Sequence, residues 1–362
     1  MKIENVNVLL GDSFVCADVL FEDKIQKIIP RESLKPQGYL IPGLVDIHTH
    51  GRMGADFSDG TEEGLQTLSR AYAECGVTSF LATTMSVSEL ALMNAMAAVR
   101  GFKRKGGAKC AGVHLEGPFL SEKKRGAHAE QFLRDPDVAL FHRLNDECGG
   151  MVKMITVAPE RRGAPDFIRE VAKSAVVSLG HTAADYELAM KAFECGASHV
   201  THLFNAMEPF LHRSPNLVGA AMDSGASVEL ICDGLHIHPA VMRAAFALFG
   251  ERVNLISDSI RCSGMREGED ELGGSPVFVK EGKVTLFDGT LAGSSISLLE
   301  GVRRAVKFGV PLEKAVYAAT TAPALAAKLD AGKIEVGESS DLVLLNDSLE
   351  ISSIYVDGEK IV

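Results

Sequence analysis

The sequence predicts an α/β protein with two parts, a (β/α)8 TIM barrel and a small β-sandwich domain formed by both chain ends. Eight short apolar runs recur through the middle of the chain, stretches with helical periodicity separate them, and both ends alternate polar and apolar residues. With 362 residues, 46% of them hydrophobic, the chain is long enough for one large core and a small accessory unit. We expect residues 43–332 to form the barrel and residues 1–42 and 333–362 to form the small domain.

The eight apolar runs have the length and composition of buried parallel strands. They begin near Leu44, Val77, Gly112, Val152, Ala175, Ser198, Val228 and Val253. Helix-like segments lie between the runs, such as Glu62 to Glu74, Pro136 to Glu147, Ala184 to Glu194 and Pro239 to Phe249. Strand–helix units repeated over about 250 residues are typical of a closed parallel barrel. An open doubly wound sheet is the alternative, but it usually has fewer strands, and no G-x-G-x-x-G turn follows any run here.

Both chain ends have the alternating pattern of small antiparallel β elements. Turn signals stand at Gly11-Asp12 and Glu22-Asp23 near the beginning and at Asp357-Gly358 near the end. Neither end is long enough to bury a core alone, so we expect the two to pair into one domain beside the barrel. The Pro42-Gly43 step would mark the entry into the barrel.

Composition excludes several classes of function. The net charge of −11 disfavours a general affinity for nucleic acid or an anionic membrane, although a local positive pocket could still bind a small anionic substrate. The seven cysteines are widely spaced and form no C-x-x-C pair, which argues against a disulfide framework and a thiolate zinc site and fits a reducing compartment. We see no signal peptide and no apolar run of about 18 residues or more. We therefore expect a cytoplasmic protein with no nucleic-acid or membrane partner.

The sharpest chemical signal is a pair of histidines, His48 and His50, at the end of the first apolar run. Residues i and i+2 of a strand point to the same face, which at the C-terminal end of a barrel strand is the barrel mouth. Neutral imidazoles placed there can bind a divalent metal ion. A chance pair of histidines at a strand end is the alternative for this motif taken alone.

Several other apolar runs also end in a histidine or a carboxylate. Glu116 ends the third run, His181 the fifth, His202 the sixth and Asp258 the eighth, and His236 follows the seventh. Barrel enzymes place their chemistry at this rim, and chance or stability alone explains such a cluster of costly polar groups poorly. The predicted constellation is His48, His50, Glu116, His181, His202 and Asp258.

Other polar residues near the runs have less specific interpretations. We favour a structural role for His114, leave His199 open, and take Asp46 as a partner that orients the metal ligands. His142 and His212 fall in expected helix or loop and carry no specific expectation. The rival interpretation of Asp258 is a helix N-cap within Ser-Asp-Ser.

The constellation suits the hydrolysis of an unreactive bond such as an amide. A divalent ion lowers the pKa of water toward about 7 and polarises a carbonyl. A carboxylate must then take the proton of the attacking water and pass it to the departing nitrogen. We expect Asp258, at the end of the last strand, to be that carboxylate.

Several longer motifs narrow the family. They are His114-Leu115-Glu116-Gly117-Pro118-Phe119, Lys124-Arg125-Gly126-Ala127-His128, Gly180-His181-Thr182, Thr201-His202-Leu203-Phe204-Asn205-Ala206-Met207, Asp233-Gly234-Leu235-His236 and Thr290-Leu291-Ala292-Gly293-Ser294. Over nearly its whole length, the chain resembles the amidohydrolase superfamily and, more narrowly, the N-acetylglucosamine-6-phosphate deacetylases. The resemblance implies hydrolysis of the N-acetyl group of N-acetylglucosamine 6-phosphate to give glucosamine 6-phosphate and acetate.

The resemblance also implies roles for individual residues. The main metal ion would be held by Glu116, His181 and His202, while His48 and His50 make a second ion plausible. Zinc is the expected metal, and iron, manganese and cobalt also suit imidazole and carboxylate ligands. The implied substrate-binding residues are Ala127, His128, Asn205, Ala206, Arg213 and His236. Members of the family are commonly homodimers, and Arg213 could serve the site of the neighbouring subunit.

Some alternatives stay open. N-acetylgalactosamine 6-phosphate differs from the glucosamine compound by the configuration at one hydroxyl, and the sequence does not separate the two. A dihydropyrimidinase-type enzyme would need a lysine on the strand that ends in Glu116, where none stands. A non-catalytic barrel acting as a binding module would be expected to lose ligands or Asp258. The sequence departs from many relatives after Asp258, where Ser259 to Met265 brings in Arg261.

Overall fold

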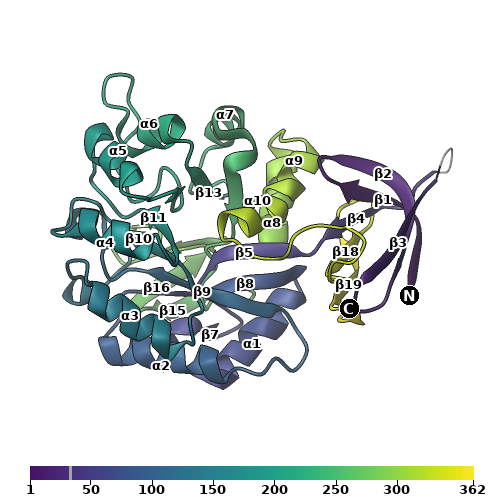
Figure 1. The fold of residues 1–362 in the computed structure, drawn as a ribbon, viewed down its shortest axis with the longest axis horizontal. Coiled ribbons are helices and arrows are strands. Elements are labelled where there is room, and N and C mark those ends of the chain that lie inside the picture. The colour runs from purple at the N-terminus through teal and green to yellow at the C-terminus, as the bar shows by residue number, and fades with distance from the viewer. Residues whose placement is uncertain (32–34) are drawn as a thin grey trace.

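The computed structural model describes residues 1–31 and 35–362, and its largest element is a parallel sheet of eight strands (Figure 1). In chain order the strands are β5 (Leu44–Thr49), β8 (Val77–Thr84), β9 (Lys109–Glu116), β10 (Val152–Val157), β11 (Val176–Leu179), β12 (His199–Val200), β13 (Ser227–Ile231) and β14 (Val253–Ile256). Each strand pairs with the next one along the chain. At the mouth the N–H of Asp258, beyond β14, donates to the carbonyl of His48 in β5 at 3.0 Å. The predicted barrel is therefore confirmed.

Helices cover the outer face of this barrel (Figure 1). The described residues contain α1 (Glu62–Ala73), α2 (Glu89–Gly101), α3 (Val138–Glu147), α4 (Ala164–Val171), α5 (Tyr186–Glu194), α6 (Asn216–Ser224), α7 (Pro239–Phe249), α8 (Leu298–Lys307), α9 (Leu312–Tyr317) and α10 (Thr321–Ala326). Short 3-10 turns are η1 (Phe57–Asp59), η2 (Glu122–Lys124), η3 (Glu130–Phe132) and η4 (Gly250–Arg252). The α3 and α5 helices begin later than predicted because Asp137 and Asp185 act as N-caps, each accepting backbone N–H groups of the first turn.

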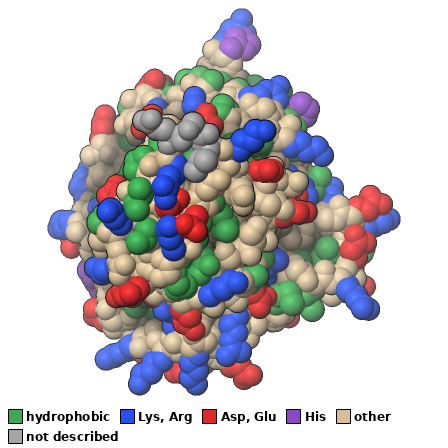
Figure 2. Space-filling model, turned by 90° about the vertical axis from the view of Figure 1, so that its right-hand side faces the viewer, with side chains coloured by type: hydrophobic (Ala, Val, Ile, Leu, Met, Phe, Trp, Pro, Cys, Tyr) green, Lys and Arg blue, Asp and Glu red, His purple; other side chains and the backbone are tan. Residues whose placement is uncertain are grey.

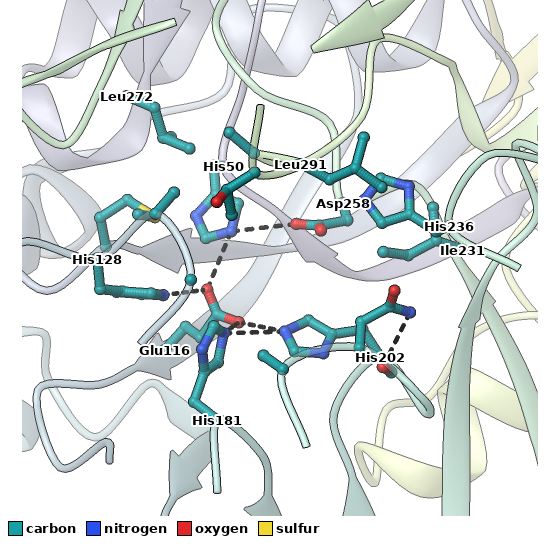
Figure 3. Close-up of a pocket in the computed structure, with 18 of the residues that line it drawn as sticks. His50, Glu116, His128, His181, His202, Ile231, His236, Asp258, Leu272 and Leu291 are labelled. Atoms are coloured by element: carbon teal, nitrogen blue, oxygen red, sulfur yellow. Dashed lines mark hydrogen bonds and ion pairs between the residues drawn. The ribbon is translucent and has the colours of Figure 1, made fainter. Parts of the chain in front are cut away.

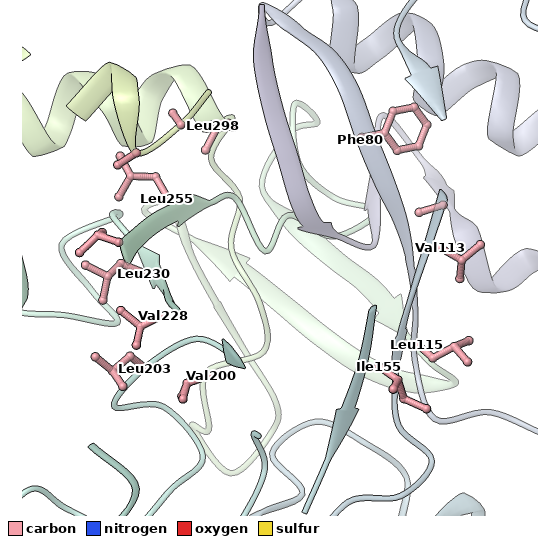
Figure 4. Close-up of a cluster of buried hydrophobic side chains, with 14 of the residues drawn as sticks. Phe80, Val113, Leu115, Ile155, Val200, Leu203, Val228, Leu230, Leu255 and Leu298 are labelled. Atoms are coloured by element: carbon pink, nitrogen blue, oxygen red, sulfur yellow. The ribbon is translucent and has the colours of Figure 1, made fainter. Parts of the chain in front are cut away.

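Alternation along the barrel strands separates an apolar outer face from a mixed interior. In β9, Val113 and Leu115 point outward into the main hydrophobic core, together with Phe80 of β8 (Figure 4). The residues between them, His114 and Glu116, therefore share the inner face. The inner face carries apolar side chains near the bottom, such as Ile47 and Leu81, whereas polar side chains fill the layers nearer the mouth.

The two chain ends form one small sheet beside the barrel (Figure 1). Its strands are β1 (Lys2–Leu10), β2 (Ser13–Phe21), β3 (Ile25–Pro30), β4 (Tyr39–Pro42), β18 (Leu342–Leu345), β19 (Ile351–Val356) and β20 (Glu359–Lys360). β4 lies between β1 and β18, so it joins the two ends of the chain. The sheet curls until the ring of Phe21 in β2 meets Tyr355 of β19 at 5.0 Å, which encloses a core of its own. The side that faces the viewer in Figure 2 carries basic and acidic side chains interspersed.

A β element that the sequence did not predict lies between β14 and α8. Strands β15 (Gly268–Leu272), β16 (Ser275–Lys280) and β17 (Lys283–Thr285) form an antiparallel meander. Elsewhere, just after β5, β6 (Gly51–Arg52) pairs with β7 (Ala55–Asp56) in a separate two-stranded sheet. The meander packs on the barrel through an apolar cluster that includes Leu272, Val277, Ile260 and Met85. This cluster places Leu272 at the mouth. Among the described residues, no helix is long and apolar enough to cross a membrane.

Candidate metal centre and active-site cavity

A cavity of about 260 Å³ opens at the C-terminal rim of the barrel (Figure 3). Its lining comes from the ends of the barrel strands and the loops that follow them, from Leu272 of the meander, and from the segment beyond the meander. The predicted site residues that line it are His50, Glu116, Ala127, His128, His181, His202, Asn205, Ala206, His236 and Asp258. His48 lies directly below them and is fully buried.

The first group of possible ligands is Glu116, His181 and His202. The Oε1 atom of Glu116 lies 3.2 Å from Nε2 of His181 and 3.1 Å from Nε2 of His202. The two Nε2 atoms are only 3.0 Å apart (Figure 3). Two imidazole lone pairs facing each other repel unless a proton or a cation lies between them. This donor set fits a divalent ion of the kind that imidazole and carboxylate ligands bind.

The second group is His48, His50 and Asp258. The Oδ1 atom of Asp258 lies 3.3 Å from Nε2 of His50 and 3.6 Å from Nε2 of His48. Nε2 of His48 is buried without a hydrogen-bond partner. Glu116 belongs to both groups, since its Oε1 is 3.3 Å from His48 and its Oε2 is 3.2 Å from His50. These donors would also fit a divalent ion, and Glu116 lies within reach of both groups.

Unusual backbone conformations aim three of these side chains into the cavity. His181, His202 and Asp258 each follow a barrel strand and have φ values of 46°, 28° and 46°. Left-handed conformations of this kind cost non-glycine residues about 1–3 kcal/mol and cluster at functional sites. Gly180 permits the close approach at His181, because a Cβ there would lie 2.6 Å from Cβ of Thr201.

The cluster perturbs the pKa values of its members in opposite directions. Burial raises the pKa of Glu116, but the neighbouring His48 and His128 outweigh burial and hold it well below its usual range. Burial lowers the pKa of His50, yet hydrogen bonds to Asp258 and Glu116 raise it to about 9. The pKa of Asp258 is lowered, because the bond to His50 outweighs burial. Without a metal ion, the cluster therefore holds ionised carboxylates beside protonated imidazoles.

His128 lies on the other side of Glu116 (Figure 3). The backbone N–H of Ser86 donates to its Nδ1 at 3.1 Å, which leaves the ring proton on Nε2. Nε2 then donates to Oε2 of Glu116 at 3.1 Å. Burial lowers the pKa of His128 to about 4, so the ring is a neutral donor at the cavity wall.

His236 lies at the far end of the cavity from His128 (Figure 3). Its Nδ1 lies 2.6 Å from Oδ2 of Asp233, whose other oxygen accepts the N–H groups of Leu235 and His236 at 2.8 Å. Asn205 and Ala206 line the same cavity, and Lys124 is the only lysine or arginine among the lining residues. Arg213 is not among them, because it lies on an exposed turn closed by Leu211 and Ser214.

The structure also shows the surroundings of the polar residues whose role the sequence left less specific. His114 is buried below the site between the carbonyl of Ile47 (3.0 Å) and Oγ1 of Thr156 (2.8 Å), which agrees with a structural role. Asp46 accepts the backbone N–H groups of His48 and Ser257 at 3.4 and 3.3 Å. Asp258 does not begin a helix, so the N-cap interpretation is wrong.

Two further residues change the expected picture. Arg261 is held by Asp59 at 2.5 Å and does not line the cavity. Glu229 was missed by sequence reasoning, although it is fully buried and contacts His48, His199 and His202. The available signal was a carboxylate within the apolar run of residues 228–231.

Comparisons with known proteins agree with this geometry. The model of the amidohydrolase family matches residues 39–361. The chain is 39% identical to an N-acetylglucosamine-6-phosphate deacetylase of Bacillus subtilis, covering 86% of this chain and 82% of the relative. It is 33% identical to an N-acetylgalactosamine-6-phosphate deacetylase of Escherichia coli O157:H7, covering 88% and 87%. A mutant N-acetyl-D-glucosamine-6-phosphate deacetylase of Mycobacterium smegmatis, solved with N-acetyl-D-glucosamine-6-phosphate, superposes with a TM-score of 0.94 at 31% identity, covering 100% and 99%.

Proposed function

Because the chain belongs to the amidohydrolase family, we propose that it hydrolyses N-acetyl-D-glucosamine 6-phosphate to D-glucosamine 6-phosphate and acetate. The observation that carries the proposal is the convergence of Glu116, His181 and His202 beside Asp258 in one rim cavity, on a fold shared with deacetylases. The galactosamine isomer has less support, since the relative that acts on it is less similar.

We propose that the site binds one or two divalent ions, with zinc as the expected metal and iron, manganese or cobalt as alternatives. Glu116, His181 and His202 would hold the main ion, and His48 and His50 would hold the second. A bound divalent ion supplies Lewis-acid polarisation of the amide carbonyl and lowers the pKa of water. The orphaned Nε2 of His48 and the facing nitrogens of His181 and His202 support this assignment.

Asp258 would act as the proton carrier. Its carboxylate is ionised, because the bond to His50 lowers its pKa, and it can therefore accept a proton from the attacking water. The water oxygen bonds to the carbonyl carbon, the C–N bond breaks, and Asp258 returns the proton to the leaving nitrogen. Acetate and the free amine are the products. His128, whose Nε2–H donates to Oε2 of Glu116, lines the cavity, and this N–H would turn from Glu116 to the acetyl carbonyl when substrate binds, orienting and polarising it.

The phosphate would bind at the opposite end of the cavity. His236, held by Asp233, and the backbone near Asn205 and Ala206 would contact it, while Ala127, next to His128, would contact another part of the substrate. We propose that the protein is a cytoplasmic homodimer in which Arg213 of one protomer reaches the cavity of the other. The exposed position of Arg213, outside the cavity of its own chain, supports this role.

Acetate release from three substrates tests the proposed function. Zinc-loaded protein is incubated separately with N-acetylglucosamine 6-phosphate, its galactosamine isomer and unphosphorylated N-acetylglucosamine. The proposal expects N-acetylglucosamine 6-phosphate to have the highest kcat/KM of the three. For the unphosphorylated sugar, it expects kcat/KM to fall mainly because KM rises. Faster turnover of the galactosamine isomer would replace the substrate, and no release from any of the three would overturn the proposal.

A further inference from the structure

A carboxylate without an assigned role lies beneath the metal ligands. Glu229 is in the middle of β13 and is fully buried in the polar layer of the barrel interior. An ionised carboxylate is costly to bury unless it is paired and hydrogen-bonded. Its Oε2 contacts Nδ1 of His48 at 2.9 Å and accepts the N–H of His202 at 3.0 Å, while Oε1 lies 3.3 Å from Nε2 of His199.

The contact to Glu229 decides which nitrogen of His48 is free. Oε2 of Glu229 already accepts the backbone N–H of His202, so it serves as an acceptor, and Nδ1 of His48 must carry the proton and donate to the same oxygen. In the neutral ring the lone pair is then on Nε2, which faces Oε1 of Glu116 at 3.3 Å and Oδ1 of Asp258 at 3.6 Å. The opposite tautomer would set the lone pair of Nδ1 against Oε2 of Glu229 and turn an N–H group toward the second ion.

Packing restrains the His48 ring in this orientation. The ring of His114 lies edge-on to it with centroids 4.7 Å apart, and His114 is itself fixed by Ile47 and Thr156. Since His114 has both nitrogens bonded, it is not available as a ligand or as a substitute partner. Glu229 is therefore the group that orients His48.

We propose that Glu229 is a positioning residue that fixes His48 in the tautomer needed to bind a second divalent ion. Hydrogen bonding of this kind orients metal-binding histidines, and its loss typically weakens metal affinity about 10–100-fold. The inference rests on the metal-dependent function proposed above, and it adds that the two-ion state depends on a residue that contacts no substrate. The same carboxylate accepts the backbone N–H of His202, so it supports the loop of the first ligand group as well.

Ion binding to Glu229→Gln tests this inference without any sugar substrate. The glutamine oxygen can still accept from the N–H of His202 and from Nδ1 of His48, since both contact Oε2, but the negative charge that strengthens the bond to His48 is lost. Metal-free wild type, Glu229→Gln, His48→Asn and the double variant are titrated with Co²⁺ by calorimetry while the visible spectrum is recorded. We expect wild type to bind two ions, and Glu229→Gln to weaken the second by about 10–100-fold and the first by less than about threefold.

The double variant separates positioning from general electrostatics. If Glu229 acts through His48, adding Glu229→Gln to His48→Asn causes no further change in Co²⁺ affinity. In the Glu229→Gln single variant, only the visible spectrum of the second Co²⁺ ion should differ from that of wild type. An equal effect of Glu229→Gln in both backgrounds, or unchanged binding of two ions, would overturn the inference and leave the proposed function intact. Wild type that binds no ion would overturn both.

A measurement on wild type avoids any loss of folding in the variants. Long-range ¹H–¹⁵N correlation spectra of histidine-labelled, zinc-loaded protein report which nitrogen of each ring carries the proton. The inference expects His48 to be protonated at Nδ1. Protonation at Nε2 would overturn it.

Discussion

Replacing Asp258 with asparagine removes the proposed proton carrier while preserving its surroundings. Asparagine has the same shape, and it tolerates the left-handed conformation found here, with φ of 46°, better than most residues. It can keep a hydrogen bond near His50, which lies 3.3 Å from Oδ1 of Asp258. The variant is therefore expected to fold and to retain Glu116, His181 and His202, the proposed metal ligands, yet its side chain cannot take a proton from water.

The size of the expected loss follows from the lack of a substitute base in the cavity. Both oxygens of Glu116 already face histidines, and burial lowers the pKa of His128 to about 4, which makes it a poor proton acceptor. General acid–base catalysis contributes about 10²–10⁴-fold, and without a replacement we expect the upper half of that range. A fall in kcat of about 10³–10⁴-fold corresponds to about 4–5.5 kcal/mol in the barrier.

The assay follows acetate release from N-acetylglucosamine 6-phosphate, with the ion content of each preparation determined by elemental analysis. Asp18→Asn is a matched control, because Asp18 is another buried carboxylate but lies in β2 of the small sheet. We expect the control to keep kcat within about threefold, because Asp18 does not line the cavity and its loss should affect the stability of the small sheet and not the chemical step. Retention of more than about a tenth of wild-type kcat by fully metallated Asp258→Asn would refute the role of Asp258.

Four further outcomes are expected. Chelation should abolish activity, and added Zn²⁺ should restore it. Ion binding should release protons and strengthen as pH rises toward about 9, because His50, with a pKa of about 9, must lose its proton before it can bind the ion. Calorimetry in buffers of different ionisation heat measures this proton release, and a binding heat that is the same in all buffers would contradict it. His236→Asn should raise KM for the phosphorylated sugar at least about tenfold with kcat within about threefold, whereas equal losses in kcat and kcat/KM would contradict a phosphate-binding role. Asp18→Asn should lower the Tm at pH 7, because Arg31 and the N–H of Asn5 hold the pKa of Asp18 below its usual range. That deficit should shrink as pH falls below about 4, where the unfolded-state carboxyl and then the folded one are protonated, and a pH-independent deficit in thermal melts would contradict it.

Strand periodicity explains why much of the fold and site was predictable. A period of two along β9 puts His114 and Glu116 on the inner face, and the same rule places His48 and His50 together. Because parallel strands of a barrel end at one rim, ligands distant in sequence were expected to converge, and they do at Glu116, His181 and His202.

Other features depend on tertiary contacts that a local pattern does not carry. The strands of the β15–β17 meander are short, and β15 is polar except for Gly268 and Leu272, so the alternation is weak, yet the meander brings Leu272 to the cavity. Glu229 breaks an apolar run, and only the three-dimensional neighbours of its carboxylate distinguish a ligand-orienting residue from a strand irregularity. The exposure of Arg213 likewise required the conformation of its turn.

The position of β4 between β1 and β18 has a consequence for the order in which the protein acquires its structure. During synthesis β4 is made early, whereas its partner β18 follows only after the whole barrel sequence. Until then one edge of β4 has unpaired N–H and C=O groups, which makes it a template for association with other chains. A ribosome that stalls before Leu342 would thus release a chain with an open strand edge next to a nearly complete barrel.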